Sequence, residues 1–311
     1  MNNWQLNPIN FKFQISDWIV YTATLPLQVK IEELNTTTAP VEQPDLPETQ
    51  LVESSQGFCI RNLPIAKNLP VITRTDKYIR YIPLQYPHCY IDLSWSFEQY
   101  IEKFSPKTRS TIRRKIRKYT EYCDGELQWK TYSKPEEVTE FFEIAKNVSV
   151  LTYQERLLDA GLPNNQEFIK ESEHLANKDQ LRAYILFHND RPVSYLYCPA
   201  KNGTLIYSYL GYNPEYQKLS VGTILQWLAI EQIFSERKFK FFDFTEGLSS
   251  HKLFFSSHQN LCANVFFVRR TLTNTVLIHS HWLMDRLSKS LGNTLDRYGL
   301  KTKVKKLLRR G

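Results

Sequence analysis

The chain has 311 residues, of which 42% are hydrophobic and 14% aromatic, a composition that supports a buried core and excludes an intrinsically disordered chain. Its formal net charge is +8 and its isoelectric point is about 9.1, so the expected partners are nucleic acid, an anionic membrane surface or an anionic ligand. The length suits one large domain or two modest ones.

The cysteines argue against a disulfide-stabilised scaffold. They are five in number, widely spaced and without a CxxC pair, which is typical of free thiols in a reducing compartment. The first residues lack the basic and apolar regions of a secretory signal, and no apolar stretch reaches the roughly 18 to 20 residues of a membrane-spanning helix. We therefore expect a cytoplasmic protein.

The N-terminal third is rich in β-type sequence. Residues 1–34 contain short β-type runs, and residues 35–56 contain three prolines and little apolar content, which is typical of a loop or linker. Residues 57–93 are strand-like again, and we expect Pro64, Pro70, Pro83 and Pro87 to cut these strands short. The pattern predicts a β-rich lobe over residues 1–95.

Helical periodicity begins at Ser96, which with Gln99 resembles a capping box. Ser105 before Pro106 predicts a second helix, and its first turns are strongly basic. The basic residues are Lys107, Arg109, Arg113, Arg114, Lys115, Arg117 and Lys118. A capping box at residues 133–136 predicts a helix to about residue 148, and residues 152–158 predict a further short helix.

A meander of strands follows. We predict strands over residues 180–187, 192–199 and 204–210, joined by turns with hairpin signals. A polar turn then leads into a helix over about residues 222–237, which is followed by strands at 239–244 and 261–270 and by a helical, increasingly basic end. The strands on either side of the 222–237 helix should run parallel, because a crossover helix joins them.

The turn at residues 217–223 is the strongest functional signal. It lies between a strand and a helix and contains the single glycine Gly222. Backbone N–H groups at a helix N-terminus bind anions, and Lys218 adds a positive charge. The turn is therefore a candidate phosphate site, although the same pattern also suits an ordinary strand-to-helix loop.

This order of elements resembles the GNAT superfamily of acyl-CoA-dependent N-acyltransferases, more closely its CelD-type subgroup and, distantly, the FemABX-type transferases. The resemblance covers roughly residues 95–270, with Ser220 in place of a glycine of the superfamily's pyrophosphate loop. The matching segments are residues 104–115, 152–158, 191–194, 217–223, 242–247 and Lys252. It implies an α+β fold with a mixed, mostly antiparallel sheet flanked by helices. It also implies an acyltransferase domain over residues 96–272, with a possible degenerate second lobe at 1–95 and a basic helical tail over 273–311.

The resemblance implies that acetyl-CoA or another acyl-CoA is the donor. Pantetheine would pair with the strand edge at Ser208 and Leu210. The pyrophosphate would lie on the turn, formed by Gln217, Lys218, Leu219, Ser220, Val221, Gly222 and Thr223. The acceptor would be an amine, with an amino sugar or another cell-envelope precursor of polysaccharide biosynthesis as the expected class.

Four residues near this turn are candidate catalytic groups. Asp243 and Glu246 follow a strand, where a carboxylate can accept the amine proton or simply cap a loop. Lys252 can bind an anionic donor or remain exposed. Tyr207 and Tyr209 share one strand face by the period of two, and we expect Tyr209 to protonate the leaving thiolate unless both are packed core aromatics.

The residues expected to bind the acceptor come from the basic helix, from the segment at 152–158 and from the position before Lys252, where this chain departs from the resemblance. The candidates are Arg109, Arg113, Tyr153 and His251. An anionic acceptor is favoured over duplex DNA, because no helix-turn-helix pattern accompanies the basic helix. The dispersed histidines indicate no metal site. Residues 300–310 combine leucines with lysines and arginines, which suits either an anionic membrane surface or a frayed tail.

Two other functions stay open. In the first, the donor is an aminoacyl-tRNA, as the distant FemABX resemblance implies. In the second, the fold is retained without activity, and the chain is a basic adaptor for membrane or nucleic acid.

Overall fold

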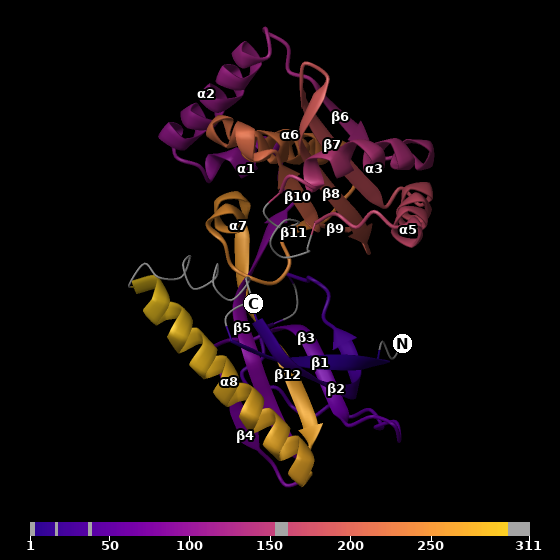
Figure 1. The fold of residues 1–311 in the computed structure, drawn as a ribbon, viewed down its shortest axis with the longest axis vertical. Coiled ribbons are helices and arrows are strands. Elements are labelled where there is room, and N and C mark those ends of the chain that lie inside the picture. The colour runs from indigo at the N-terminus through magenta and orange to yellow at the C-terminus, as the bar shows by residue number, and fades with distance from the viewer. Residues whose placement is uncertain (1–3, 16–17, 37–38, 153–160, 298–311) are drawn as a thin grey trace. The chain divides into compact units, whose positions relative to one another are not determined.

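A computed structural model describes residues 4–15, 18–36, 39–152 and 161–297. The chain divides into two compact units (Figure 1): the first unit comprises residues 1–87 and 260–311, and the second unit comprises residues 88–259. The long strands β5 (Tyr78–Asp92) and β12 (His258–Arg269) contribute residues to both units.

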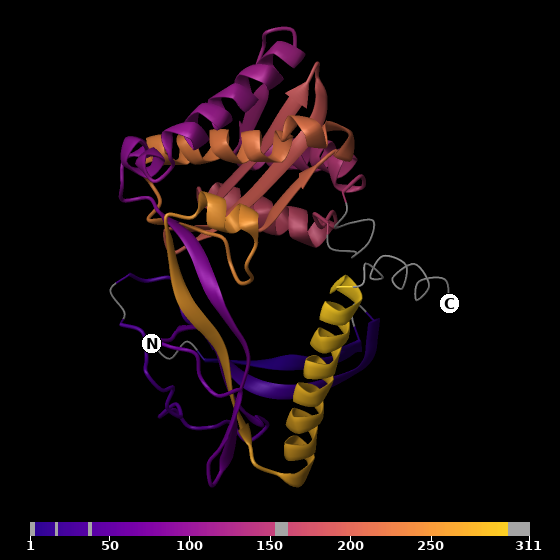
Figure 2. The same cartoon turned by 90° about the vertical axis from the view of Figure 1, so that its left-hand side faces the viewer.

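The second unit is a sheet with helices on both faces (Figure 2). Its strands follow the order β5-β11-β9-β8-β7-β6, with β10 on β8. The strands are β6 (Trp129–Tyr132), β7 (Leu181–His188), β8 (Arg191–Lys201), β9 (Thr204–Ile206), β10 (Tyr209–Tyr212) and β11 (Phe241–Asp243). The helices are α1 (Phe97–Glu102), α2 (Pro106–Tyr122), α3 (Pro135–Ser149), α5 (Gln166–Asn177), the 3-10 helix η1 (Pro214–Leu219), α6 (Val221–Glu236) and α7 (Ser250–Phe255).

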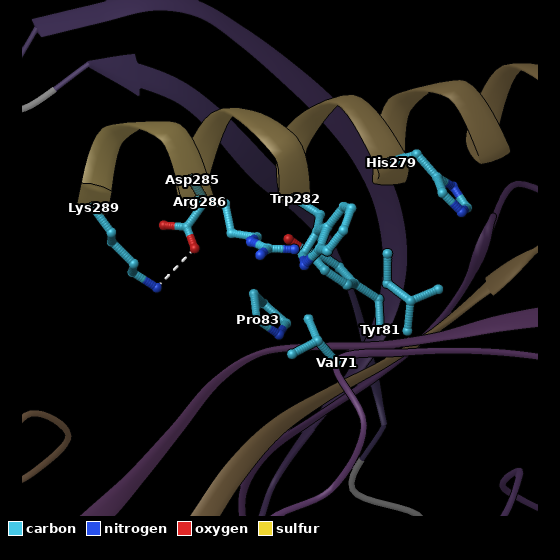
Figure 3. Close-up of a pocket in the computed structure, with 9 residues that line it drawn as sticks. Val71, Tyr81, Pro83, His279, Trp282, Asp285, Arg286 and Lys289 are labelled. Carbon is cyan, nitrogen blue, oxygen red and sulfur yellow. Dashed lines mark hydrogen bonds and ion pairs between the residues drawn. The ribbon is translucent and has the colours of Figure 1, made fainter. Parts of the chain in front are cut away.

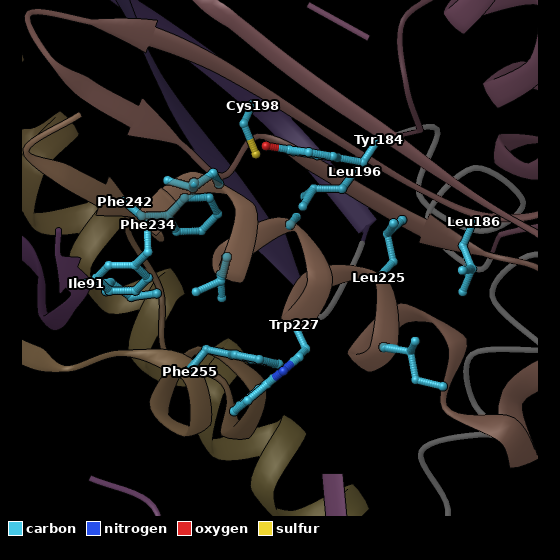
Figure 4. Close-up of a cluster of buried hydrophobic side chains, with 14 of the residues drawn as sticks. Ile91, Tyr184, Leu186, Leu196, Cys198, Leu225, Trp227, Phe234, Phe242 and Phe255 are labelled. Atoms are coloured by element: carbon cyan, nitrogen blue, oxygen red, sulfur yellow. The ribbon is translucent and has the colours of Figure 1, made fainter. Parts of the chain in front are cut away.

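Both faces of this sheet are buried, and the alternation along β7 shows how. Tyr184 and Leu186 face the cluster under α1, α2 and α6, whereas Ala183 and Ile185 face the cluster under α3 and α5. Figure 4 shows the first cluster, in which aromatic and aliphatic side chains of α6 meet those of the strands. Helix α6 is apolar around most of its circumference because it lies between the sheet and other helices.

The predicted fold class is confirmed: the chain is a mixed α+β protein with a mostly antiparallel open sheet flanked by helices. The crossover prediction is also confirmed. Strand β9 precedes α6 in the sequence and β11 follows it, and the two strands pair in parallel. The capping box at Ser96 and the Ser105 cap before Pro106 occur as predicted.

Several local predictions were wrong. The capping box of α3 is one residue later than expected, since the Glu137 carboxylate accepts the N–H groups of Ser133 and Lys134. Strand β5 continues through Pro83 and Pro87, because the fixed φ of proline suits extended backbone. Strand β6 and helices α5 and α7 were not predicted, and the predicted helix at 152–158 lies almost wholly outside the described residues.

The first unit consists of a long β-hairpin, two further strands and one long helix, together with its parts of β5 and β12. These elements are β1 (Gln5–Ile15), β2 (Trp18–Ile31), β3 (Gly57–Pro64), β4 (Ile72–Arg74) and α8 (Leu272–Arg297). Residues 35–56 contain no helix or strand in their described part. Helix α8 packs through Ile278 and Trp282 on a cluster that includes Phe11, Tyr81 and Phe266.

The compact units do not follow the predicted boundaries of 95–96 and 272–273. Strand β12 enters the first unit at residue 260, where it pairs with β3, so residues 260–272 group with the N-terminal strands. In the described part of the chain, no helix is both long enough and apolar enough to cross a membrane.

Candidate active site

The sheet of the second unit opens between β10 and β11. Strand β9 pairs in parallel with β11 as far as Ile206 and Asp243, and the Tyr207 N–H donates to the Asp243 carbonyl oxygen at 2.8 Å. Beyond that point β10 pairs with β8, and among the described residues it pairs with no other strand. The other edge of β10 is therefore open for main-chain hydrogen bonds to a ligand.

The N-terminus of α6 lies next to this opening. Ser220 adopts the left-handed conformation (φ 57°, ψ 37°), and the first helical hydrogen bond runs from the Ile224 N–H to the Ser220 carbonyl oxygen at 3.1 Å. The N–H groups of Val221, Gly222 and Thr223 precede that bond, and no side chain caps them in the described structure. Three amide donors are thus presented at the positive end of a helix.

A cavity of about 400 Å³ joins the open strand to the helix terminus. We call it the donor cavity. Its lining consists of Tyr207, Leu210, Tyr212, Gln217, Ser220, Val221, Gly222, Thr223, Ser249, His251 and Lys252. The structure therefore brings together most of the predicted donor residues with two residues of α7 that are about 30 positions away in the sequence.

Other predicted residues lie elsewhere. Lys218 and Leu219 do not line the donor cavity, and Lys218 is exposed on η1. Arg109 is partly buried and Arg113 is exposed on α2, and neither lines the donor cavity. Tyr153 lies outside the described residues.

His251 is held in the donor cavity by Gln226, a fully buried residue of α6 that the sequence analysis missed. The imidazole Nε2 is hydrogen-bonded to the Gln226 side-chain oxygen. With the Gln226 oxygen as the acceptor of this bond, Nε2 carries the hydrogen of the neutral ring and Nδ1 keeps the lone pair. Burial lowers the pKa of His251 and favours this neutral form.

This lowered pKa predicts a pH dependence of stability. The unfolded chain binds a proton at His251 near the ordinary pKa of 6.5, whereas the folded chain binds it only at lower pH. Stability should therefore fall as the pH drops below about 6.5 and through the folded-state pKa. In urea unfolding between about pH 7.5 and pH 5, the free energy of unfolding of His251→Gln should fall less than that of the wild type. An identical decline in both proteins would contradict the prediction.

Lys252 of α7 is hydrogen-bonded to the loop between β11 and α7. Its Nζ donates to the Glu246 carbonyl oxygen at 2.7 Å, and burial lowers its pKa. The Glu246 side chain is exposed, so the structure places its backbone, rather than its carboxylate, beside the cavity-lining lysine.

Asp243 lies at the end of β11 in a polar cluster that the sequence analysis did not anticipate. Its Oδ1 accepts the Thr245 N–H at 2.6 Å and pairs with Nε2 of His88, which is 2% exposed. Asp243 lines neither the donor cavity nor the second cavity of this unit. His88 lies in β5, far from Asp243 in the sequence, so only the pairing of β5 with β11 brings the two together.

A second cavity of about 400 Å³ lies on the other side of the break between β9 and β10. We call it the acceptor cavity, after the role that we propose for it below. It is lined by Phe168, Glu171, Leu175, Tyr197, Pro199, Tyr207, Ser208, Tyr209 and Thr245. Tyr207 lines both cavities, so it marks the place where they approach one another.

The prediction that Tyr207 and Tyr209 share a strand face was wrong. The strand is interrupted at Tyr207 and Ser208, so the period of two does not continue through it. Tyr207 packs with Phe242 and Phe244 on the α6 side, whereas Tyr209 packs with Phe168 on the α5 side.

The cost of the left-handed conformation at Ser220 can be measured by substitution. A left-handed conformation costs an L-residue roughly 1–2 kcal/mol, and glycine avoids this cost but loses more backbone entropy. Ser220→Gly should therefore stabilise the protein by up to about 1 kcal/mol in urea unfolding, and Ser220→Ala should not. A less stable glycine variant would show that the Ser220 side chain contributes more than its backbone conformation costs.

Among the described residues, no group of three or more His, Cys, Asp or Glu side chains is arranged to hold a metal ion. All five cysteines are buried thiols outside any disulfide. Burial raises the pKa of Cys89 and Cys198, so neither thiol is activated as a nucleophile.

Residues 106–253 match the family model described as an acetyltransferase (GNAT) domain. The match includes β9, β10, the turn, α6 and the cavity-lining residues of α7. It confirms the resemblance to the GNAT superfamily for this part of the chain and indicates an acyltransferase domain. The CelD-type subgroup stays a prediction.

Solved structures with related architecture are more distant, and no curated protein matches the chain. L-PGS from Bacillus licheniformis is 14% identical with a TM-score of 0.44, covering 73% of this chain and 72% of its own. FemX is 10% identical with a TM-score of 0.45, covering 73% and 75%. A GCN5-related N-acetyltransferase from Kribbella flavida is 11% identical with a TM-score of 0.34, covering 61% and 60%. At scores this low, the similarities do not decide the donor or the acceptor.

Proposed function

We propose that this protein transfers an acyl group, with acetyl as the expected group, from acyl-CoA to an amine. The observation that carries the proposal is the donor cavity, where three uncapped amides of α6 lie beside the open edge of β10. The amides would bind the CoA pyrophosphate, and the strand edge would pair with the amides of pantetheine. Gln217 and Lys252 add polar contacts in the same cavity.

The acceptor amine would enter through the acceptor cavity. Glu171 supplies a carboxylate that attracts an ammonium group, and Phe168, Tyr197 and Tyr209 supply aromatic surface. This lining favours a cationic amine over the anionic acceptor suggested by the basic helix, whose Arg109 and Arg113 do not reach it. An amino sugar presents such an amine together with hydroxyl groups, and remains the expected class.

The proposed chemistry takes place at Tyr207, the residue that lines both cavities. The neutral amine attacks the thioester carbon, the C–S bond breaks and CoA leaves as a thiolate. Main-chain N–H groups of the open strand would stabilise the oxyanion. His251 Nδ1 is the group we propose to accept the amine proton, in place of Asp243, which is engaged with His88 and Thr245. Tyr207 is the group we propose to protonate the thiolate, because it lines both cavities whereas Tyr209 lines one.

Calorimetry with acetyl-CoA tests the donor, and mass spectrometry of a panel of amino sugars and polyamines incubated with acetyl-CoA tests the acceptor. Binding with transfer to one class of amine supports the proposal. Absence of binding at millimolar acetyl-CoA overturns it.

An aminoacyl-tRNA donor is the second candidate. Most of the basic residues of α2 are exposed, so the helix presents a cationic face suited to an RNA backbone. Binding of aminoacylated tRNA, lost at high salt and not competed by acetyl-CoA, would favour this donor over acyl-CoA.

A further inference from the structure

Helix α8 of the first unit exposes an apolar face. Its residues are Leu272, Val276, Leu283, Leu287 and Leu291, each 50% or more exposed. Their spacing places them on one side of the helix, opposite the buried Asn274 and Ile278. A helix packed on one side normally presents polar residues to water, so this leucine stripe indicates a surface that is covered in use.

A second apolar feature lies beside the same helix. Residues 18–21 at the end of the β1–β2 hairpin are Trp, Ile, Val and Tyr, and all are 45% to 62% exposed. Phe13 of β1 contacts the His281 ring of α8 at 5.4 Å and the Tyr21 ring of β2 at 5.7 Å. The hairpin end and α8 are therefore neighbours, and both faces of the hairpin end are exposed.

The net positive charge of the chain belongs to this unit. The first unit contains 18 Lys and Arg and 10 Asp and Glu, whereas the second unit contains 22 of each. Six of the basic residues lie between positions 301 and 310, directly after α8 in the sequence. The unit with the exposed leucines is thus the cationic unit, and the unit with the candidate active site is electrically balanced.

One cationic side chain, Arg286, borders the stripe, whereas Lys289 lies on the same side of α8 as the buried Ile278. Figure 3 shows Arg286 and Lys289 of α8 beside a cavity of about 670 Å³ with Trp282, Tyr81 and Pro83 in its wall. The Arg286 guanidinium lies 5.2 Å from the Trp282 ring centre, and Lys289 pairs with Asp285 at 2.7 Å. An arginine next to an apolar helix face is suited to lipid phosphates.

We propose that the first unit docks on an anionic lipid bilayer through the leucine stripe of α8 and the hairpin end at residues 18–21. The leucines would enter the boundary between headgroups and acyl chains, where tryptophan and tyrosine are also favoured. Arg286 would contact the phosphates. A second copy of the chain is a poorer occupant, because two surfaces of the same positive sign would be brought together.

The test is co-sedimentation of the full chain with phosphatidylcholine vesicles that contain or lack phosphatidylglycerol. Binding is expected to the anionic vesicles, to weaken with salt and to weaken at least about tenfold in Leu283→Gln/Leu287→Gln and in Trp18→Ser. Leu46→Gln is the matched control, because Leu46 is an exposed leucine of the same unit outside both features, and it should bind as the wild type does.

Three results would overturn the proposal: no binding of the wild type to anionic vesicles, equal binding of the double variant, or a solution dimer that the double variant converts to a monomer. Acetyl-CoA calorimetry and thermal unfolding on the same proteins separate lost docking from lost folding. The proposed docking does not depend on the proposed reaction, since a protein that fails to bind acetyl-CoA can still bind vesicles.

Discussion

Gly222→Glu is expected to weaken acetyl-CoA binding by at least about 100-fold, a loss of about 2.7 kcal/mol. Gly222 lines the donor cavity in the first turn of α6, so the new carboxylate would occupy the place proposed for the pyrophosphate and repel it. The fold should persist, because glutamate is favourable in the first turn of a helix. Calorimetry measures the affinity, and thermal unfolding measures the stability.

The matched control is Gly222→Ala. A Cβ at this position would meet Leu210 Cδ2 and Tyr212 Cδ1 at 3.3 Å, contacts that small side-chain movements relieve. The alanine variant should keep its affinity for acetyl-CoA within a few-fold of the wild type. Equal binding by the glutamate variant would show that the anion does not lie at this helix terminus.

Gly211→Ala is expected to destabilise the protein by about 1–3 kcal/mol, the range observed when a packed core is overfilled. A Cβ on Gly211 would lie 2.4 Å from Tyr195 Cε1 and 2.8 Å from Thr152 Cγ2, and both of these residues are buried. Neither neighbour has free space, so β10 would move away from β8. Urea unfolding measures the loss of stability.

Because Gly211 belongs to the strand with the open edge, the same substitution should also weaken acetyl-CoA binding. Gly222→Ala is again the comparison, since its nearest contacts are 3.3 Å rather than 2.4 Å. Similar stability of the two alanine variants would mean that β10 moves without cost and that its position beside β8 is not fixed by this packing.

Local signals were reliable for the starts of α1, α2 and α6. The caps of α1 and α2 were predicted because a cap depends on side chains within three residues of one another. The turn before α6 was predicted because a strand, a polar loop and an apolar helix follow each other directly. Helix α5 was missed although the Asn165 side chain caps it and its apolar residues follow a helical period.

The candidate site required contacts between distant segments. Gln226 was missed as a partner because a glutamine inside an apolar helix has no distinctive sequence pattern, and only the packing of α7 against α6 explains its burial. His88 was missed for the same reason, since its partner Asp243 lies 155 positions away. The tyrosine assignment was wrong because sequence periodicity assumes an uninterrupted strand.

The sequence by itself determined most of the order of elements, the mixed α+β class and the position of the turn at 217–223 between a strand and a helix, since periodicity, caps and chain order are local properties. Only the tertiary structure decided that β10 separates from β11, that His251 and Lys252 join Gly222 in one cavity, and that Tyr207 rather than Tyr209 lines both cavities. Cavities form where strands stop pairing and helices pack against one another. These contacts join segments that are far apart in the sequence, so they cannot be recognised from the immediate sequence neighbours of a residue.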